Sequence, residues 1–536
     1  MTRTDPSVVA GAPVETIEAI GGEAAAGAPM QRALVRDGEI VAPVQRGAPG
    51  AGRIRSGKLV GLTMSQAIWV LSWPVLAESF LGSLVGIVDT TLAAGISAAA
   101  ADAIGAASYI AWALALIGLA LGTGATAIVA RSLGKGRNAV ANAAVGQTVI
   151  LSLSLGVVVA AIVFVGAPAL ARVLNLSAEA AKAMVVYLRV IALGVPALSL
   201  VTACIACQRG AGDAKRPLAI MLTINALNIP ISWVLSGVDI ATLSRTDAGE
   251  LTRKILIENP FSFDVGILGV ALGTLAAQLL GACIVLAMLA RGGSGVRLRA
   301  RRLRPHWHTM RRLVRVGMPN FFESVGMWTG NFLVLLLVGF MGSEGLYGAH
   351  IVAIRIESLS FLPGFAMGLS AATLAGQYLG AGSVREARNA TLRCTAIAAT
   401  LMGTMGLLFI LFPERIVGVL TQQPEHLAIT PTLVRMAGFV QIPFAIMLVL
   451  RNALRGVGDT RAAMFITWFS TFAVRLPLAW LLSGVDIPLP GDAIVPNPGP
   501  DWGLRGLWIG LLIELVIRSM LFAVRFSLGA WKRLRV

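Results

Sequence analysis

The sequence predicts an all-α polytopic membrane protein, with twelve transmembrane helices in two six-helix bundles related by a pseudo-two-fold axis along the membrane normal. Three observations support this fold class: an apolar composition, apolar stretches of membrane-spanning length and an internal repeat. Hydrophobic residues make up 56% of the 536 residues and charged residues only 13%, with a mean hydropathy of +0.78. A water-soluble chain of this length could not cover so much apolar surface.

Twelve stretches are long enough to cross a bilayer, which takes about 20 mostly apolar residues in a helix. We expect the helices at about residues 65–94, 105–132, 142–168, 183–208, 217–238, 265–290, 316–341, 346–378, 389–412, 430–455, 461–484 and 503–528. The segment before them, residues 1–60, is rich in Ala, Gly and Pro and has no apolar core. This composition predicts a disordered cytoplasmic tail.

An internal repeat relates the first six helices to the last six. Four segments recur in the same order: Pro74 with Glu78 as Pro319 with Glu323, Leu133–Gly136 as Leu379–Gly382, Arg209–Asp213 as Arg455–Asp459, and Trp233–Ile240 as Trp480–Ile487. Collinear matches of this kind indicate a duplicated half. Because each half has an even number of helices, both enter the membrane in the same direction, and a cleft between them is a natural substrate path.

Arginine and lysine determine the predicted orientation, because they accumulate in cytoplasmic loops. Every second connection is basic, above all residues 291–315, which contain Arg291, Arg297, Arg299, Arg301, Arg302, Arg304, Arg311, Arg312 and Arg315. The sequence therefore predicts a cytoplasmic tail (1–60), an N-terminal bundle (61–290), a basic cytoplasmic linker (291–315) and a C-terminal bundle (316–536). Both termini are expected in the cytoplasm.

The net charge of +17 is explained by this basic inner face. We expect no nucleic-acid partner, and we expect a monomer in the cell (inner) membrane, in contact with the lipid bilayer and its anionic headgroups. The four histidines are dispersed, and Cys204 and Cys207 lie in an apolar helix without a nearby histidine. We therefore expect no enzymatic activity, no metal site and no cofactor.

Acidic residues inside the first half are the candidates for ion coupling, because charges in hydrocarbon are costly and tend to be functional. Glu78 and Asp89 lie eleven residues apart (89 − 78) on one helix, which at about 100° per residue places them on nearly the same face. Desolvation favours the protonated form of a carboxylate that has no fixed cation. Asp89 could therefore carry a proton, bind Na⁺ or a cationic substrate, or be a static acid bonded to a neighbour. Asn225 and Asn228 would add neutral polar contacts.

The second half repeats the proline and the glutamate as Pro319 and Glu323, but Val334 stands where Asp89 would be expected. We expect Pro74 and Pro319 to weaken or kink their helices. Glu323, Gln278 and Arg475 form the predicted substrate or cation site, with Arg475 either a counter-ion for Glu323 or a cavity wall.

Another pair at membrane depth has a simpler interpretation. Glu514 and Arg518 are four residues apart on a predicted helix, so they can neutralise each other and are expected to be structural.

The sequence resembles the multidrug and toxic compound extrusion (MATE) family over about residues 60–530. The resemblance is carried by Pro74 to Thr90, Leu133–Gly136, Arg209–Asp213, Phe321–Glu323, Gln377–Gly382 and Leu454–Asp459. It implies a secondary antiporter that exports small cationic or amphipathic organic compounds, including drugs, by alternating access in exchange for H⁺ or Na⁺. It also implies that Asp89 is the ion-coupling acid and Glu323 the cation-site glutamate.

Two departures from the family pattern favour H⁺ over Na⁺. Ile229 precedes Pro230, where many relatives have an aspartate, and Phe444 stands where some Na⁺-coupled relatives have an acid. The alternative is a flippase of lipid-linked glycans with a related two-bundle fold. Such a protein would favour a wide cationic cavity, and Arg355 and Arg475 keep this alternative open.

Overall fold

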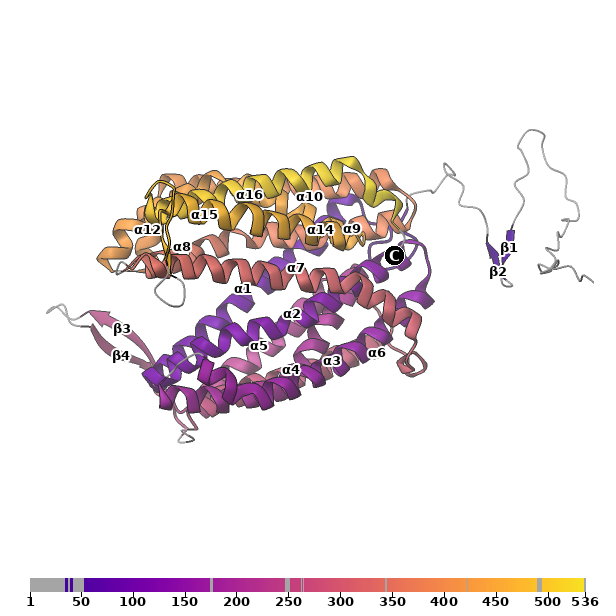
Figure 1. The fold of residues 1–536 in the computed structure, drawn as a ribbon. Coiled ribbons are helices and arrows are strands. Elements are labelled where there is room, and N and C mark those ends of the chain that lie inside the picture. The colour runs from indigo at the N-terminus through magenta and orange to yellow at the C-terminus, as the bar shows by residue number, and fades with distance from the viewer. Residues whose placement is uncertain are drawn as a thin grey trace, which may run out of the picture. The chain divides into compact units, whose positions relative to one another are not determined.

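The structure is a computed structural model that describes residues 34–36, 39–41 and 53–534, apart from 174–176, 246–250, 262, 264, 343–344, 422 and 489–493. The chain divides into two compact units, Met1–Ala51 and Gly52–Val536. The described part of the first unit is an antiparallel hairpin of β1 (Leu34–Arg36) and β2 (Glu39–Val41). All described helices belong to the second unit (Figure 1).

Most of the tail predicted to be disordered, residues 1–60, lies outside the described residues. Its last part, residues 53–60, is ordered: Ile54 and Leu59 are buried, and Lys58 Nζ lies 2.9 Å from Asp213 Oδ2. The prediction of disorder is wrong for these residues, because two apolar side chains and an ion pair fix them to the helices.

The first half of the repeat forms six long helices. They are α1 (Met64–Ile96), α2 (Ala98–Gly134), α3 (Asn138–Val173), α4 (Ala178–Gly210), α5 (Lys215–Ser236) and α6 (Ile267–Arg291). Between α5 and α6 the chain forms a hairpin of β3 (Ile240–Arg245) and β4 (Leu251–Ile257).

The second half follows the same plan with more breaks. Its elements are α7 (Trp307–Phe340), α8 (Leu346–Ser360), α9 (Leu362–Gly380), α10 (Val384–Leu411), the short α11 (Pro413–Leu420), α12 (Pro424–Phe439), α13 (Gln441–Gly456), α14 (Thr460–Trp468), η2 (Phe469–Arg475), α15 (Leu476–Ser483) and α16 (Gly503–Leu528). A small hairpin of β5 (Ile487–Pro488) and β6 (Ile494–Val495) precedes α16. Two short 3₁₀ helices lie outside the spans, η1 (Ala300–Leu303) and η3 (Ala530–Arg533).

Nine helices in the described part of the chain are long and apolar enough to cross a membrane, or eleven if each of two bent pairs counts as one span. The remaining long helix is α1, with 33 residues. The bent pairs are α8–α9, at 44°, and α12–α13, at 58°. Together these elements correspond one to one with the twelve predicted helices.

Both sharp bends lie just before a proline, Pro363 and Pro443. Proline has no N–H to donate and its ring clashes with the carbonyl four residues earlier, so it breaks a helix from within. The helices α1 and α7 run without interruption through Pro74 and Pro319. A kink at these two prolines therefore stays a prediction.

The predicted linker 291–315 is shorter than expected, because α7 begins at Trp307. The His306 side chain accepts a hydrogen bond from the Thr309 N–H and caps this helix. The rest of the linker is bound to α3, where Gln147 Nε2 donates to the carbonyl oxygens of Arg302 and Arg304, each at 2.9 Å. The linker thus runs along the end of the first half instead of hanging free.

The two halves meet through equivalent helices. In the first half, α1 packs against α9, and α2 packs against both α7 and α9. Since α7 repeats α1 and the bent helix α8–α9 repeats α2, the α1–α9 and α2–α7 contacts are related by the repeat. Gly124 and Gly317 make the second contact possible, because a Cβ on either would lie 2.6 Å from a carbonyl oxygen of the other helix.

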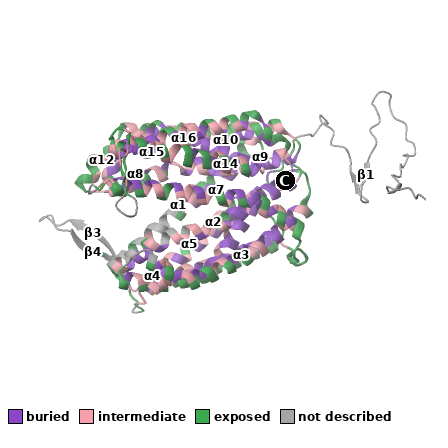
Figure 2. Cartoon of the chain, in the orientation of Figure 1, coloured by how far each residue is buried: buried purple, intermediate pink, exposed green. Residues whose placement is uncertain are grey.

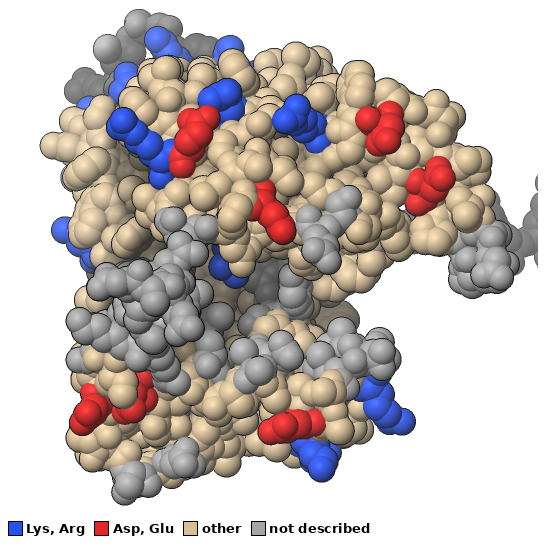
Figure 3. All heavy atoms as spheres, turned by 90° about the vertical axis from the view of Figure 1, so that its left-hand side faces the viewer, with Lys and Arg blue, Asp and Glu red and all other residues tan. Residues whose placement is uncertain are grey.

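These contacts gather at one end of the helices, which we call the basic end. It carries the turns Gly134–Arg137, Arg209–Arg216, Gly380–Arg388 and Arg455–Arg461. Buried residues are concentrated there, around the ends of α2 and α9 (Figure 2). The opposite end, which we call the hairpin end, carries β3–β4 and β5–β6. Figure 3 looks onto the hairpin end and shows a surface hollowed between two lobes.

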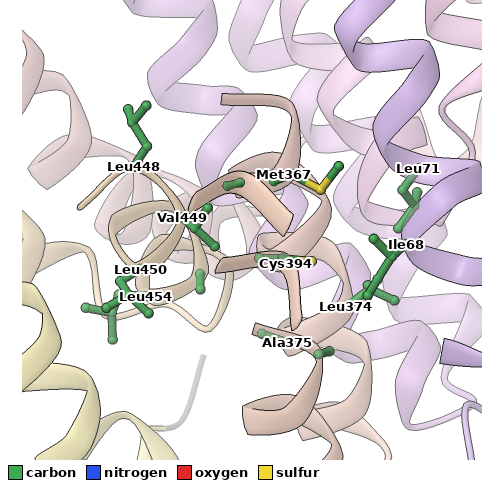
Figure 4. Close-up of a cluster of buried hydrophobic side chains, with 14 of the residues drawn as sticks. Ile68, Leu71, Met367, Leu374, Ala375, Cys394, Leu448, Val449, Leu450 and Leu454 are labelled. Atoms are coloured by element: carbon green, nitrogen blue, oxygen red, sulfur yellow. The ribbon is translucent and has the colours of Figure 1, made fainter. Parts of the chain in front are cut away.

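The largest apolar cluster joins the halves near the basic end. Ile68 and Leu71 of α1 pack in it with Met367 and Leu374 of α9 and with Leu448 of α13 (Figure 4). The outward faces of the helices expose large apolar side chains such as Val165 of α3 and Phe465 of α14. Exposed apolar belts of this kind are expected on a surface that faces lipid.

The repeated Trp-x-Leu-Ser-Gly-Val-Asp-Ile segment forms a latch at the hairpin end. Trp233 Nε1 donates to the Val238 carbonyl oxygen at 2.8 Å, Asn259 Nδ2 donates to the Trp233 carbonyl oxygen at 2.8 Å, and the Asn259 N–H donates to Asp239 Oδ1 at 2.7 Å. The second half repeats each bond with Trp480, Val485, Asn497 and Asp486. The latch fixes the irregular segment that follows each hairpin to the helix that precedes the hairpin.

Candidate functional site

A cavity of about 340 Å³ lies between the two halves, lined by α1, α2, α4, α5 and α6 on one side and by α9 and α13 on the other. Its walls are mostly apolar, with a few polar groups: Glu78, Thr123, Thr126, Arg209, Gln278, Thr373, Asn452 and Arg455. An apolar cavity with a small number of convergent polar groups is the usual form of a small-molecule site. It contains residues from both copies of the repeat, as the sequence predicts for a substrate path.

In the first half, Glu78 of α1 forms an ion pair with Arg209 of α4. Arg209 Nη2 lies 2.5 Å from Glu78 Oε2, and the glutamate is buried. The Arg209 carbonyl oxygen in turn accepts a hydrogen bond from Thr373 Oγ1 of α9 at 3.1 Å. Glu78 therefore has a fixed cation at the cavity wall, at the junction of the two halves.

In the second half, Glu323 of α7 forms the equivalent ion pair with Arg455 of α13. Arg455 Nη2 lies 2.8 Å from Glu323 Oε2, and Thr467 Oγ1 donates to Glu323 Oε1 at 2.8 Å. Glu323 is fully buried. Each arginine is the first residue of the repeated Arg-Gly-x-Gly-Asp segment, so the repeat encodes two matching pairs. Glu78 and both arginines line the cavity, whereas Glu323 does not.

Arg475 is neither the counter-ion of Glu323 nor a lining residue of this cavity. Arg475 Nε lies 3.2 Å from Glu514 Oε2, and Arg475 Nη1 donates to Asn331 Oδ1 at 2.6 Å. Its place beside Glu323 is taken by Arg455. The pair expected within α16 is present, with Arg518 Nε 2.6 Å from Glu514 Oε1.

This network is built on an irregular helix. The segment η2 is a π-helix that ends just before Pro477, and the Leu476 N–H donates to the Thr471 carbonyl oxygen, five residues earlier. The wider turn presents Ser470 and Thr471 to Arg518, which donates to Ser470 Oγ at 2.7 Å and to Thr471 Oγ1 at 2.9 Å. π-helical turns are frequent at functional sites.

Polar atoms of α5 and α6 lack partners in the first half. Asn228 Nδ2 donates to Thr274 Oγ1 at 3.0 Å. However, Asn228 Oδ1, Asn225 Nδ2 and Gln278 Oε1 are buried without a hydrogen-bond partner among the described residues. Leaving a buried polar atom unpaired costs about 1–3 kcal/mol. These atoms are therefore candidates to bind an ion or a substrate.

Asp89 lies in α1, and its side chain is outside the described part of the chain. Its role stays a prediction. In the second half, Val334 at the corresponding position is buried in an apolar cluster with Leu337 and Val338. At this position the first half has an acidic residue and the second half an apolar one, as the sequence indicates.

The described residues contain no group of three or more His, Cys, Asp and Glu side chains that could hold a metal ion. Buried Cys204 and Cys207 are free thiols.

Comparison with known proteins identifies the family. The sequence model of the MatE family matches residues 74–234 and 319–481, one match in each half of the repeat. The chain belongs to the MatE family. The protein is therefore a multi-pass membrane transporter, and the resemblance found in the sequence is confirmed.

Two curated relatives cover almost the whole repeat. The probable multidrug resistance protein NorM of Thermotoga maritima is 27% identical over 464 residues, which are 86% of this chain and 92% of that protein. The multidrug resistance protein MdtK of Yersinia enterocolitica is 26% identical over 461 residues, 86% of this chain and 94% of that one.

The fold is also found among solved structures. One, described as the outward-facing conformation of a multidrug resistance MATE family transporter of the MOP superfamily, matches with a TM-score of 0.77 at 19% identity. The match covers 91% of this chain and 100% of that chain. The predicted fold class, twelve transmembrane helices in two bundles, is thereby confirmed.

The sequence does not by itself reveal the partners of the two glutamates. Arg209 and Arg455 are visible in the repeat, and the available signal is that a glutamate and an arginine recur together in both halves. Neither Arg451 nor Asn331 carries such a signal, because neither belongs to the repeated segments.

Proposed function

We propose that this MatE family transporter exports small cationic and amphipathic organic compounds, including drugs, in exchange for H⁺ or Na⁺. The observation that carries the proposal is the apolar cavity between the two halves. Its lining includes the Glu78–Arg209 pair of the first half and, from the second half, Arg455, which is paired with the buried Glu323. The names of the relatives, which are multidrug resistance proteins, agree with drug-like substrates. A 340 Å³ cavity suits a small organic molecule.

The proposed orientation places the basic end in the cytoplasm, because arginine and lysine accumulate there. In this orientation the cavity is closed toward the cytoplasm. The closure includes Gln377 Nε2 donating to the Gly210 carbonyl oxygen at 2.9 Å and Asn320 Nδ2 donating to Thr123 Oγ1 at 3.0 Å. The hollow at the hairpin end would then face outward, and the two described ends of the second unit, residues 53 and 534, would lie at the cytoplasmic side.

Ion coupling is proposed to act through Asp89. Glu78 and Glu323 are each neutralised by an arginine, so neither is a free acid for a coupling ion. Protonation of Asp89 would remove its charge, weaken its attraction for a bound cation and favour release outward. Loss of the proton inside would restore the cation-binding form. The missing acids at Ile229 and Phe444 favour H⁺ as the ion.

The flippase alternative is not favoured. A lipid-linked glycan needs a wide cavity, whereas this one is small and mostly apolar. Neither of the two arginines that kept the alternative open lines the cavity: Arg475 is paired with Glu514 and Asn331, and Arg355 is not a lining residue.

The test is efflux of a fluorescent organic cation from proteoliposomes that carry an imposed pH gradient. We expect wild type to move the cation against its gradient and Asp89→Asn to fall to the protein-free background. Asp501→Asn, a change of an exposed aspartate at the hairpin end, should transport at the wild-type rate. Full efflux by Asp89→Asn would refute the role of Asp89. If a Na⁺ gradient drives efflux and a pH gradient does not, the coupling ion is Na⁺ and not H⁺.

A further inference from the structure

One face of α7 carries three successive positions that each meet an arginine. Glu323, Met327 and Asn331 are spaced by four residues, so they lie above one another on the same face. Three contacts run along this face: Arg455 Nη2 to Glu323 Oε2 at 2.8 Å, Arg451 Nη1 to Met327 Sδ at 3.2 Å, and Arg475 Nη1 to Asn331 Oδ1 at 2.6 Å. We call these contacts the arginine seam.

In the middle contact of the arginine seam, Arg451 has only the weak acceptor Met327, whereas the other two arginines each bind an oxygen acceptor. Arg451 is only 8% exposed, and the thioether sulfur of Met327 is a weak acceptor. Arg451 Nε has no hydrogen-bond partner among the described residues. No carboxylate in the described part of the chain forms an ion pair with Arg451. A buried guanidinium in this state is costly, and an anion that reached it would remove the cost.

The surroundings of the arginine seam also have surplus positive charge. The second half buries or half-buries Arg451, Arg455, Arg475 and Arg518 close to one another. Opposite them are Glu323 and Glu514, which are paired as described, and Glu357 of α8, whose carboxylate interacts with Arg475. Among the side chains that the structure describes here, four cations therefore face three anions, and Arg451 is the cation that forms no ion pair.

Arg451 is close to the cavity. It lies one helical turn from Arg455 on α13, and Arg455 and the neighbouring Asn452 both line the cavity. One turn of helix is about 5.4 Å along the axis. Arg451 itself is not among the lining residues, so a molecule in the cavity would have to extend a group along α13 toward the hairpin end to reach its guanidinium.

We propose that Arg451 binds a carboxylate group of an organic solute that occupies the cavity. Two parallel N–H donors of a guanidinium match the two oxygens of a carboxylate, and the Nε of Arg451 is free to supply one of them. The substrates would then include zwitterions, which carry a carboxylate as well as a cationic group. This inference rests on the proposed export of organic cations and adds a second, anionic recognition point in the C-terminal bundle.

The test uses two dyes that differ only at one carboxyl group, a rhodamine ethyl ester and the corresponding free acid. Binding to the purified full-length protein in detergent is measured by fluorescence anisotropy. The key variant is Met327→Glu, which gives Arg451 an internal carboxylate, and its matched control is Met327→Gln, which has the same shape without the charge. Arg451→Gln removes the cation itself.

We expect wild type and Met327→Gln to bind both dyes. In Met327→Glu and Arg451→Gln, the affinity for the free acid should fall by about ten-fold or more, as for the loss of a charge-assisted hydrogen bond, while the ester changes less than about two-fold. Met327→Glu should unfold thermally at or above the wild-type temperature, because it pairs Arg451. An equal loss of both dyes in these variants would make Arg451 a structural residue and overturn the inference.

Failure of this inference and failure of the proposed function give different results. If wild type binds the ester but not the acid, the anion site is wrong and the export of cations stands. If wild type binds neither dye, the proposed substrate class fails. The site is then tested with benzoate alone, which should raise the unfolding temperature of wild type but not of Arg451→Gln. No shift in wild type would overturn the anion site as well.

Discussion

The duplication has kept a Glu–Arg pair in both halves, and both arginines line the cavity. Glu78 with Arg209 and Glu323 with Arg455 each join the first helix of a half to its fourth. Because each charge is neutralised nearby, the pairs can persist at membrane depth at a lower cost than isolated charges. The sequence indicates which residues recur, but not that they touch, since the pairing depends on how the helices pack.

Removing one member of the Glu323–Arg455 pair should destabilise the protein, because the substitution leaves the other charge buried and unpaired. Glu323→Gln or Arg455→Gln should each lower the free energy of unfolding by about 3–5 kcal/mol, because the remaining charge is buried alone. The double variant should recover part of the loss. Reversible unfolding in detergent measures this.

The chain offers a matched exposed pair as a control. Arg435 and Glu414 lie 2.8 Å apart, with side chains 49% and 65% exposed. Glu414→Gln should cost less than about 1 kcal/mol. If Glu323→Gln and Glu414→Gln lowered the free energy of unfolding equally, burial would not determine how much the Glu323–Arg455 pair stabilises the protein.

At the level of elements, the apolar stretches predict the helices well, because membrane-spanning length and hydropathy are local properties. What they do not predict are the breaks at Phe361 and Val440 and the π-helix Phe469–Arg475. Prolines follow each of these, at 363, 443 and 477, yet Pro74 and Pro319 leave their helices unbroken. The outcome at a given proline depends on which neighbouring groups donate hydrogen bonds to the freed carbonyl oxygens, and the sequence does not reveal those donors.

The hairpin latch gives a prediction for one such element. Asn497 Nδ2 donates to the Trp480 carbonyl oxygen at 2.6 Å, and Asn497 Oδ1 accepts from the Gly499 N–H at 2.7 Å. Asn497→Ala removes both bonds, so we expect faster proteolysis of the connection between α15 and α16, corresponding to a local loss of about 1–3 kcal/mol.

A variant that keeps half of the latch sharpens this test. Asn497→Asp retains an acceptor for Gly499 and loses the donor to Trp480, so its cleavage rate should lie between those of wild type and Asn497→Ala. Efflux should stay near the wild-type rate in both variants, because the latch is outside the cavity. Identical cleavage of all three proteins would show that Asn497 does not hold the connection.

At the level of the whole transporter, the duplication explains why the halves close against each other at the basic end. The repeat-related contacts, α1 with α9 and α2 with α7, lie there, and the cavity opens beyond them. The difference between the halves lies inside: an acid at Asp89 in the first, and the arginine seam in the second. This division agrees with a carrier whose first half handles the coupling ion and whose second half contributes to substrate recognition.

We expect export to require that the two halves separate at the basic end. Thr123 of α2 and Asn320 of α7 touch across this junction, with Asn320 Nδ2 3.0 Å from Thr123 Oγ1. A Thr123→Cys, Asn320→Cys variant, made after the four native cysteines are replaced by serine, can be joined by a short, reducible thiol cross-linker. The two single-cysteine variants are the controls.

Efflux is measured before cross-linking, after it and after reduction. If the halves must part at the basic end, cross-linking abolishes efflux in the double variant, reduction restores it, and neither single variant is affected. Undiminished efflux by the fully cross-linked protein would contradict alternating access between the two halves.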